Sequence, residues 1–190
     1  MNIFVIDHDP VKAAEMQCDK HVVKMIVESA QILCTTHRVL DGTLKLVDSN
    51  SGKRKVKHYE LPDRRESILY KTNFINHPCN VWVRESIENY KWLFNHLEAL
   101  LKEYRMRYNK QHSYEKLINT LRQSPNNIPT IKQTPYALAF KEFYDTCLVD
   151  DPIESYQNYY KSKAEKFSMV WTKRMVPEFM HGSRYIFKEA

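Results

Sequence analysis

An imidazole, an ammonium and a carboxylate recur at helical spacing near the start of the chain, as His21, Lys24 and Glu28. At about 100° per residue, these three side chains share a polar stripe with Gln17 and Gln31. The opposite stripe is apolar and consists of Val22, Val23, Ile26, Ala30 and Leu33. This pattern predicts an amphipathic helix. The polar stripe is either a solvated face or a site that offers one substrate a proton acceptor, a cation and a phosphate clamp.

The composition favours a helical protein with a polyanionic partner. Hydrophobic residues make up 43% of the 190 residues, which excludes wholesale disorder, and only three glycines occur. The formal net charge of +6 favours nucleic acid as that partner. Twelve tyrosines and three tryptophans either stack on unpaired bases or fill helical cores. We therefore expect DNA or a nucleotide as the substrate.

Cysteine usage indicates a reduced, intracellular chain, because the four cysteines lie far apart and no apolar run of signal-peptide length follows the N-terminus. They are Cys18, Cys34, Cys79 and Cys147. The first two each precede a histidine at zinc-ligand spacing, but on one helix the two pairs would lie about 24 Å apart. We therefore expect no metal and no cofactor. We also expect no membrane partner and a cytoplasmic location, such as that of a phage protein in its host; the oligomeric state stays open.

Helix-start signals place the polar stripe near the front of the chain. Asp9-Pro10 predicts a helix from about Val11, because proline suits the first helical position. This helix either continues unbroken through Arg38 or kinks near Cys18-Asp19, where the aspartate can cap a second segment. Asp41-Gly42 should end it.

Further helices follow in the second half. Asn76-His77-Pro78 should open a long helix from about Asn80 to Tyr108, whose two tryptophans are expected in the core. Another helix is expected from His112 to Leu121. The last helix should begin at Pro152.

The region from Thr43 to Tyr59 is the least helical part, because two strand-like runs flank the turn-forming stretch Asp48–Gly52. It contains a group of cations that we call the hairpin cluster: Lys53, Arg54, Lys55 and Lys57. This cluster either follows a phosphate backbone or protects an exposed strand edge. We therefore predict one compact all-α domain over residues 1–190, with a β-hairpin-like surface insertion at 43–59.

Three blocks of the chain recur in the same order in a known family. They are Asp19-Lys20-His21 with Glu28 seven residues after the histidine, the stretch from Asn76 to Tyr108, and Tyr156-Gln157-Asn158-Tyr159-Tyr160-Lys161. They resemble the Asp-Gln-His motif with its catalytic Glu, the central helix and the aromatic Trp-Tyr-Lys-Tyr-Tyr segment of the phage-type pyrimidine-dimer DNA glycosylases. The resemblance to this small all-α repair family, also called the endonuclease V family, spans roughly half of the chain.

The resemblance implies a mechanism. In the family a Glu assists cleavage of the N-glycosidic bond, and the N-terminal α-amine, exposed by removal of the initiator Met, attacks the sugar C1′ to give a Schiff base. By position, Glu28 would be that carboxylate. Asn2 stands where the family has a small residue, and its bulk disfavours removal of Met1. Lys24 and Gln31 lie where the family surrounds its Glu with arginines, so the identity of the substrate stays open.

The same residues can be assigned roles from the chemistry. An N-glycosidic bond breaks through an oxocarbenium-like transition state, which a carboxylate such as Glu28 stabilises. His21 could hold a phosphate or protonate the leaving base, and Lys24 could clamp a phosphate or form the imine. A base in duplex DNA must first leave the stack for an aromatic pocket, for which Tyr159 and Tyr160 are the candidates.

We therefore predict a DNA N-glycosylase, with or without AP-lyase activity, that removes a damaged or modified base. The alternatives are a glycosidase acting on a free nucleotide or nucleoside, and a non-enzymatic nucleic-acid-binding module. The predicted catalytic residues are Glu28, His21 and Lys24. The predicted substrate-binding residues are Lys20, Gln31, His77, Arg84, Tyr159, Tyr160 and Lys161. Of these, His77 and Arg84 either line the site or are structural.

Overall fold

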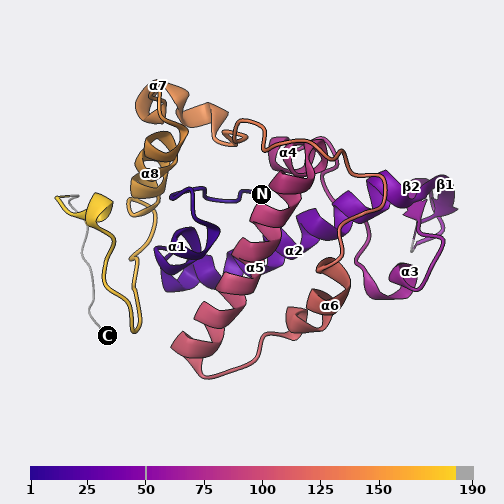
Figure 1. The fold of residues 1–190 in the computed structure, drawn as a ribbon, viewed down its shortest axis with the longest axis horizontal. Helices are drawn as coiled ribbons and strands as arrows, with labels where there is room; N and C mark the ends of the chain where they lie inside the picture. The colour runs from indigo at the N-terminus through magenta and orange to yellow at the C-terminus, as the bar shows by residue number, and fades with distance from the viewer. Residues whose placement is uncertain (50, 183–190) are drawn as a thin grey trace.

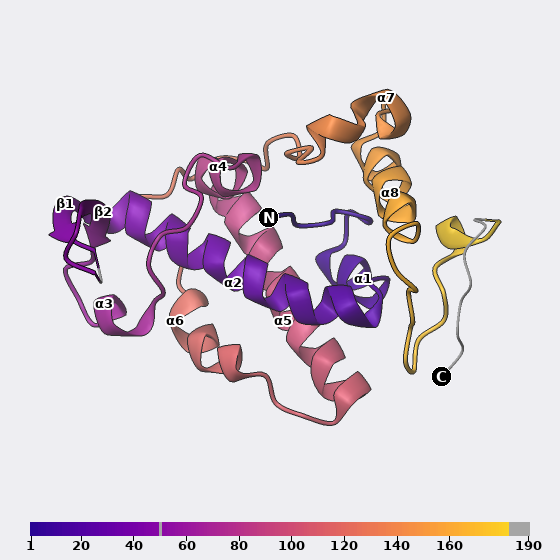
Figure 2. The same cartoon turned by 180° about the vertical axis from the view of Figure 1, so that it is seen from behind.

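Two long helices, α2 (Asp19–Asp41) and α5 (Ile87–Tyr108), cross at the centre of the protein (Figures 1 and 2). The structure is a computed structural model that describes residues 1–49 and 51–182. The two helices pack through side chains that are fully buried, among them Ile26, Leu33, Leu93 and Leu97. The apolar stripe read from the sequence is therefore the core face of α2. None of the described helices is long and apolar enough to span a membrane.

The chain breaks before α2, as the kinked alternative predicted, but Asp19 does not cap the second helix, because the N-cap residue is Cys18. Helix α1 (Pro10–Glu15) begins where the Asp9 side chain accepts a hydrogen bond from the Val11 backbone at 2.8 Å. Cys18 then adopts an extended conformation, and its backbone nitrogen donates to the Tyr160 hydroxyl at 2.8 Å. A long-range contact therefore stabilises the break, and α2 starts afresh at Asp19 and ends at Asp41.

The expected unbroken helix from Asn80 to Tyr108 is wrong. The chain forms α4 (Pro78–Glu85) and α5, with Ser86 between them in an extended conformation. The Ser86 hydroxyl accepts from the Glu88 backbone at 3.0 Å and donates to the Ile131 carbonyl at 2.8 Å. Helical periodicity continues across the break, so the sequence pattern conceals it. Only a loop that arrives from much later in the chain provides the second partner of Ser86.

The remaining elements agree with the prediction of a mostly helical domain with one hairpin. Strands β1 (Thr43–Asp48) and β2 (Lys55–Glu60) pair antiparallel, with Thr43 opposite Glu60. The short helices are α3 (Arg65–Ile68), η1 (Ser113–Leu117), α6 (Ile118–Leu121), η2 (Lys141–Phe143), α7 (Tyr144–Cys147) and η3 (Glu178–Met180). The last long helix, α8 (Pro152–Lys163), begins at the expected proline. The hairpin lies at one end of the protein and α8 at the other (Figure 1).

A buried arginine fastens the hairpin end of α2 to the chain that follows. Arg38 is 1% exposed and donates to the backbone carbonyls of Tyr59, Leu69 and Tyr70. It also forms an ion pair with the Glu66 carboxylate at 2.5 Å. A buried charge is tolerated only when it is paired and fully hydrogen-bonded, and Arg38 meets both conditions.

A second buried arginine fastens the opposite end of α2. Arg107, at the end of α5, donates to the carboxylates of Asp19 and Glu103 at 3.0 and 2.8 Å. Asp19 also accepts from the backbone and hydroxyl of Thr172, at 3.0 and 2.6 Å. The aspartate of the Asp19-Lys20-His21 motif therefore holds the start of α2 against α5 and the C-terminal segment. Both expected core tryptophans, Trp82 and Trp92, are buried.

Candidate active site at the buried N-terminus

The first residues of the chain reach the middle of α2, where they meet Glu28. The backbone nitrogen of Asn2 donates to Glu28 Oε2 at 2.7 Å. The Asn2 side chain holds this arrangement, because its oxygen accepts from the backbone nitrogens of Ile3 and Phe4 at 2.7 and 2.8 Å. Its amide nitrogen donates to the Ala139 carbonyl at 3.2 Å. Residue 2 is therefore fixed against the carboxylate on one side and the 137–140 segment on the other.

The other oxygen of Glu28 faces a lysine. Lys24 Nζ lies 3.5 Å from Glu28 Oε1, one turn away on α2. The two side chains differ in exposure, because Glu28 is 15% exposed and Lys24 is 62% exposed. The carboxylate is thus largely withdrawn from water while the ammonium remains hydrated. A hydrated ammonium suits a contact with phosphate better than it suits nucleophilic attack.

His77, at the start of α4, lies within electrostatic reach of the N-terminal amine and of the Glu28 carboxylate. Its Nδ1 accepts from the Cys79 backbone at 3.2 Å, which caps the helix. Burial lowers the pKa of His77, the positive N-terminal amine lowers it further, and the negative Glu28 opposes both. The imidazole is therefore neutral near pH 7 and lies within electrostatic reach of the N-terminus and the carboxylate.

An open pocket of about 390 Å³ lies beside these residues, within the usual size of small-molecule sites. Its lining combines His77 and Tyr159 with the 138–144 segment, which contributes Phe140 and Phe143. The Phe140 and Tyr159 rings stack with centroids 4.7 Å apart and planes 19° apart. Glu28 is among the charges that raise the pKa of Tyr159, although burial is the main cause. Glu28 does not line the pocket itself, but Asn2 connects the two, because it donates both to Glu28 and to the carbonyl of the lining residue Ala139.

A lysine that is not among the predicted site residues lies over two of the rings that line this pocket, Tyr159 and Phe143. Lys163 Nζ is 3.7 Å from the centre of the Tyr159 ring and 4.8 Å from that of Phe143. Burial lowers the pKa of Lys163 to about 8, and the positive charges of Lys166 and Lys24 contribute. The signal was present in the spacing, since residues 159 and 163 lie one helical turn apart on α8. We refer below to Lys20, Lys24, Lys163 and Lys166 as the lysine group.

His21 does not lie on a solvated stripe with Glu28. It is 4% exposed, and its ring packs against Phe4, Tyr160 and Phe167 with centroids 4.7, 5.0 and 5.3 Å away. Burial lowers the pKa of His21 to about 3, and the charges of Lys24 and Lys163 add to this. A neutral, enclosed imidazole offers no positive charge to a phosphate near pH 7, which favours a structural role. Gln17, from the same predicted stripe, is also fully buried.

Of the other predicted residues, Tyr160 and Arg84 have structural contacts, whereas Lys20, Gln31 and Lys161 lie elsewhere on α2 and α8. Tyr160 is fully buried and belongs to the core, and Arg84 donates to the Ile75 carbonyl at 2.9 Å. Lys20 is exposed, with Nζ 4.9 Å from the Phe167 ring centre. Gln31 accepts from the Asn73 side chain at 3.1 Å, and Lys161 is half-buried on α8. The structure thus brings Glu28, Lys24, His77 and Tyr159 together, and gives Tyr160 and Arg84 contacts typical of structural residues.

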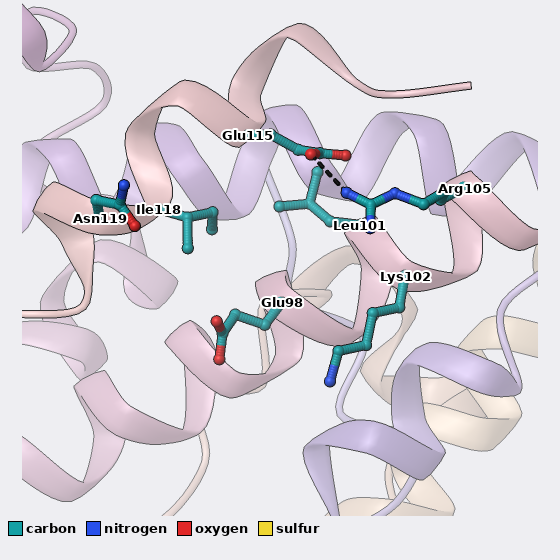
Figure 3. A pocket seen from close by; sticks show the side chains of 7 residues that line it. All are labelled: Glu98, Leu101, Lys102, Arg105, Glu115, Ile118 and Asn119. Atoms are coloured by element: carbon teal, nitrogen blue, oxygen red, sulfur yellow. Dashed lines mark hydrogen bonds and ion pairs between the residues drawn. The ribbon is translucent and has the colours of Figure 1, made fainter.

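A different pocket, of about 230 Å³, lies between α5 and the η1–α6 segment (Figure 3). An ion pair between Arg105 and Glu115 at 2.7 Å spans one side of it. None of the predicted site residues is among the seven that line it and are labelled in Figure 3. In residues 1–49 and 51–182, no group of three or more His, Cys, Asp or Glu side chains could hold a metal ion.

A helical fold in which a largely buried carboxylate meets the first residues of the chain is the arrangement that the resemblance to the small helical DNA glycosylases implies. The family model described as pyrimidine dimer DNA glycosylase matches residues 1–116, which is more than half of the 190-residue chain. The chain therefore belongs to the pyrimidine dimer DNA glycosylase family. Comparisons with curated proteins and with solved structures gave no match. The matched residues include Glu28 and His77, whereas the 138–144 segment and α8 lie beyond them.

Proposed function

We propose that this protein is a DNA N-glycosylase that removes a damaged or modified base, with Glu28 as the catalytic carboxylate. The observation that carries the proposal is the contact between Glu28 and the backbone nitrogen of Asn2, at 2.7 Å. This contact places the carboxylate that the chemistry requires next to the N-terminal end of the chain. In the family that the sequence resembles, the N-terminal α-amine is the nucleophile. Family membership supports the reaction class, and the pyrimidine dimer is the first substrate to test.

Glu28 would act through its negative charge. As the N-glycosidic bond breaks, positive charge develops on the sugar, and a fixed carboxylate nearby stabilises it. The effect is larger when water is excluded, and Glu28 is 15% exposed. Lys24, paired with the other oxygen, would hold the carboxylate in place and contact a flanking phosphate.

The nucleophile would depend on how the N-terminus is processed. While Met1 is present, the Asn2 nitrogen is a peptide amide and cannot attack; a water oriented by Glu28 would complete a simple hydrolysis. Removal of Met1 would turn the same nitrogen into an amine whose proton Glu28 can accept. Attack of this amine on C1′ would break the N-glycosidic bond and expel the base. Opening of the sugar ring, in which the C1′–O4′ bond breaks and O4′ takes up a proton, would then leave an imine, and elimination of the 3′ phosphate from the imine would break the strand. AP-lyase activity that uses the Asn2 nitrogen should therefore belong only to protein that lacks Met1.

DNA would lie across the lysine group, which spans the start of α2 and the end of α8. Three of these lysines lie over aromatic rings: Lys20 over Phe167, and Lys163 and Lys166 over Phe143. Cations next to aromatic rings are typical of surfaces that contact both phosphates and bases. The pocket lined by Phe140 and Tyr159 would receive the extruded base against its aromatic wall.

The test compares substrates and follows the covalent adduct. Duplexes with a pyrimidine dimer or another damaged base, undamaged duplexes, and free nucleotides would be incubated with the protein, and cleavage of the N-glycosidic bond measured as the abasic sugar formed. This readout is needed because the cut base of a dimer stays joined to its partner pyrimidine. Borohydride would then trap any imine, and the intact mass of the adduct would report whether Met1 is present. Cleavage in damaged duplexes is the expected result. Release from free nucleotides alone would favour the nucleotide glycosidase, and salt-dependent DNA binding without release would favour the binding module.

A further inference from the structure

An exposed aromatic side chain stands on a strained backbone close to the candidate active site. Phe74, in the loop before α4, is 67% exposed. Its φ is +45°, in the left-handed region that bulky L-residues rarely adopt. The other phenylalanine with positive φ, Phe4, is 3% exposed and packs in the core, which gives it a structural reason. Phe74 has no such reason, because most of its side chain contacts solvent.

Asn73, the residue before Phe74, is hydrogen-bonded to α2. The backbone nitrogen of Asn73 donates to Thr35 Oγ1, and its side-chain amide donates to Gln31 Oε1, both at 3.1 Å. Gln31 and Thr35 lie on successive turns of α2, and Glu28 lies on the turn before them. The residue before Phe74 is therefore hydrogen-bonded to the helix that carries the catalytic carboxylate.

The backbone of Phe74 itself is also fixed by hydrogen bonds. The Phe74 carbonyl accepts from the His77 backbone at 2.8 Å and from the Asn80 side chain at 3.0 Å. The same Asn80 nitrogen lies 4.0 Å from the sulfur of Met1. The Asn80 side-chain amide therefore contacts both Phe74 and Met1. The pocket residue His77 follows Phe74 three residues later in the chain. The strained conformation is imposed by these contacts, which border the Glu28 site.

We propose that Phe74 is a wedge that enters the DNA base stack beside the lesion and fills the space left by the extruded nucleotide. This inference rests on the proposed function. Extrusion of a nucleotide leaves a gap between base pairs, and an apolar ring that fills it recovers part of the lost stacking. A wedge has to be exposed before binding and rigidly mounted, since a flexible loop would yield instead of separating the bases. Phe74 meets both requirements, at a position where glycine would fit the backbone without strain.

The variants Phe74→Ala and Phe74→Gly test this assignment against Phe74→Trp, which keeps a flat ring. Leu46→Ala is the matched control, because Leu46 is also 67% exposed but lies on the hairpin. Single-turnover cleavage of the N-glycosidic bond would be measured on the same pyrimidine dimer in duplex and in single-stranded DNA. In the Ala and Gly variants the ratio of duplex to single-strand activity should fall about 10-fold or more, the size of one lost stacking contact. In Phe74→Trp and Leu46→Ala the ratio should stay near that of the wild type.

Thermal melting separates this role from a structural one. Phe74→Gly should melt at or above the wild-type temperature, because it relieves the positive φ and removes little packing. An unchanged activity ratio in Phe74→Ala, an equal loss on both substrates, or a clear drop in the melting temperature of Phe74→Gly would overturn the wedge. If the wild-type protein cleaves neither substrate, the proposed function fails and the wedge fails with it. Wild-type cleavage with an unaffected Phe74→Ala would overturn the wedge alone.

Discussion

Replacing Glu28 by glutamine should abolish base release while leaving the fold and the DNA affinity nearly unchanged. The amide keeps an oxygen that can accept the hydrogen bond from the Asn2 nitrogen, now 2.7 Å from Glu28 Oε2. The ion pair with Lys24 is lost, but it is a helical pair whose lysine is 62% exposed. Such pairs contribute about 0.3–0.5 kcal/mol, so the free energy of unfolding should change by less than about 1 kcal/mol.

The catalytic loss should be far larger than the structural one. The amide has no negative charge for an oxocarbenium ion, and it cannot accept a proton from water or an amine. A positioned acid–base group typically contributes about 100- to 10,000-fold, which corresponds to about 3–5 kcal/mol of barrier. The rate constant for base release in a single turnover should fall by this factor. The DNA dissociation constant should change only a few-fold, since removal of a negative charge does not weaken contacts with phosphate.

Glu88→Gln is the matched control for this measurement. Glu88 forms a comparable helical ion pair with Lys91, at 2.8 Å, on the surface of α5. Its replacement removes the same charge from the protein, so it corrects for any general effect of net charge on DNA binding. If Glu28→Gln releases base at the wild-type rate from a substrate that the native protein cleaves, Glu28 has no catalytic role. The polar stripe of α2 would then be an ordinary solvated face.

Further measurements examine the surroundings of the site. Lys24→Met should weaken DNA binding with only a modest loss of turnover and should leave borohydride trapping intact; loss of trapping would assign the imine to Lys24. Replacing the four residues of the hairpin cluster by alanine should lower the slope of log affinity against log salt; an unchanged slope would leave the cluster a role in solubility. Burial lowers the pKa of His21 and His96 to about 3 and that of His37 to about 4. As the pH falls below about 6.5, these histidines are therefore protonated in the unfolded chain before they are protonated in the folded one. The free energy of unfolding, measured with urea, should be fully retained above about pH 6.5. Below that pH it should fall by about 1.4 kcal/mol per pH unit for each histidine, until the pKa of the folded state is reached. Equal stability at about pH 7 and pH 5 would contradict this assignment.

Much of the fold and part of the site could be predicted from the sequence because they depend on neighbours along the chain. Pro10, Pro78 and Pro152 each open a helix in the structure, as the proline signals predicted. Periodicity identified the core face of α2, and the turn-forming stretch after Asp48 identified the hairpin. The order of three blocks along the chain, of which the motif around Glu28 is the first, was sufficient to recognise the family.

The surroundings of Glu28 were decided only by the tertiary structure. Asn2, Glu28, His77 and Tyr159 are far apart in the sequence, and packing alone brings them together. A polar stripe on a helical projection does not reveal which of its members another segment will cover, so His21 looked like a neighbour of Glu28 on a solvated face. The structure places His21 among aromatic rings instead.

Two further features could not be found from the sequence for the same reason. The break at Ser86 depends on an acceptor at Ile131, and the conformation of Phe74 depends on Asn73 and Asn80. By itself, the amino-acid order determined which segments are helical, where proline starts them and which family they belong to. Which side chains are buried, strained or brought together was decided by the tertiary structure, because burial and proximity depend on contacts between segments that are distant along the chain.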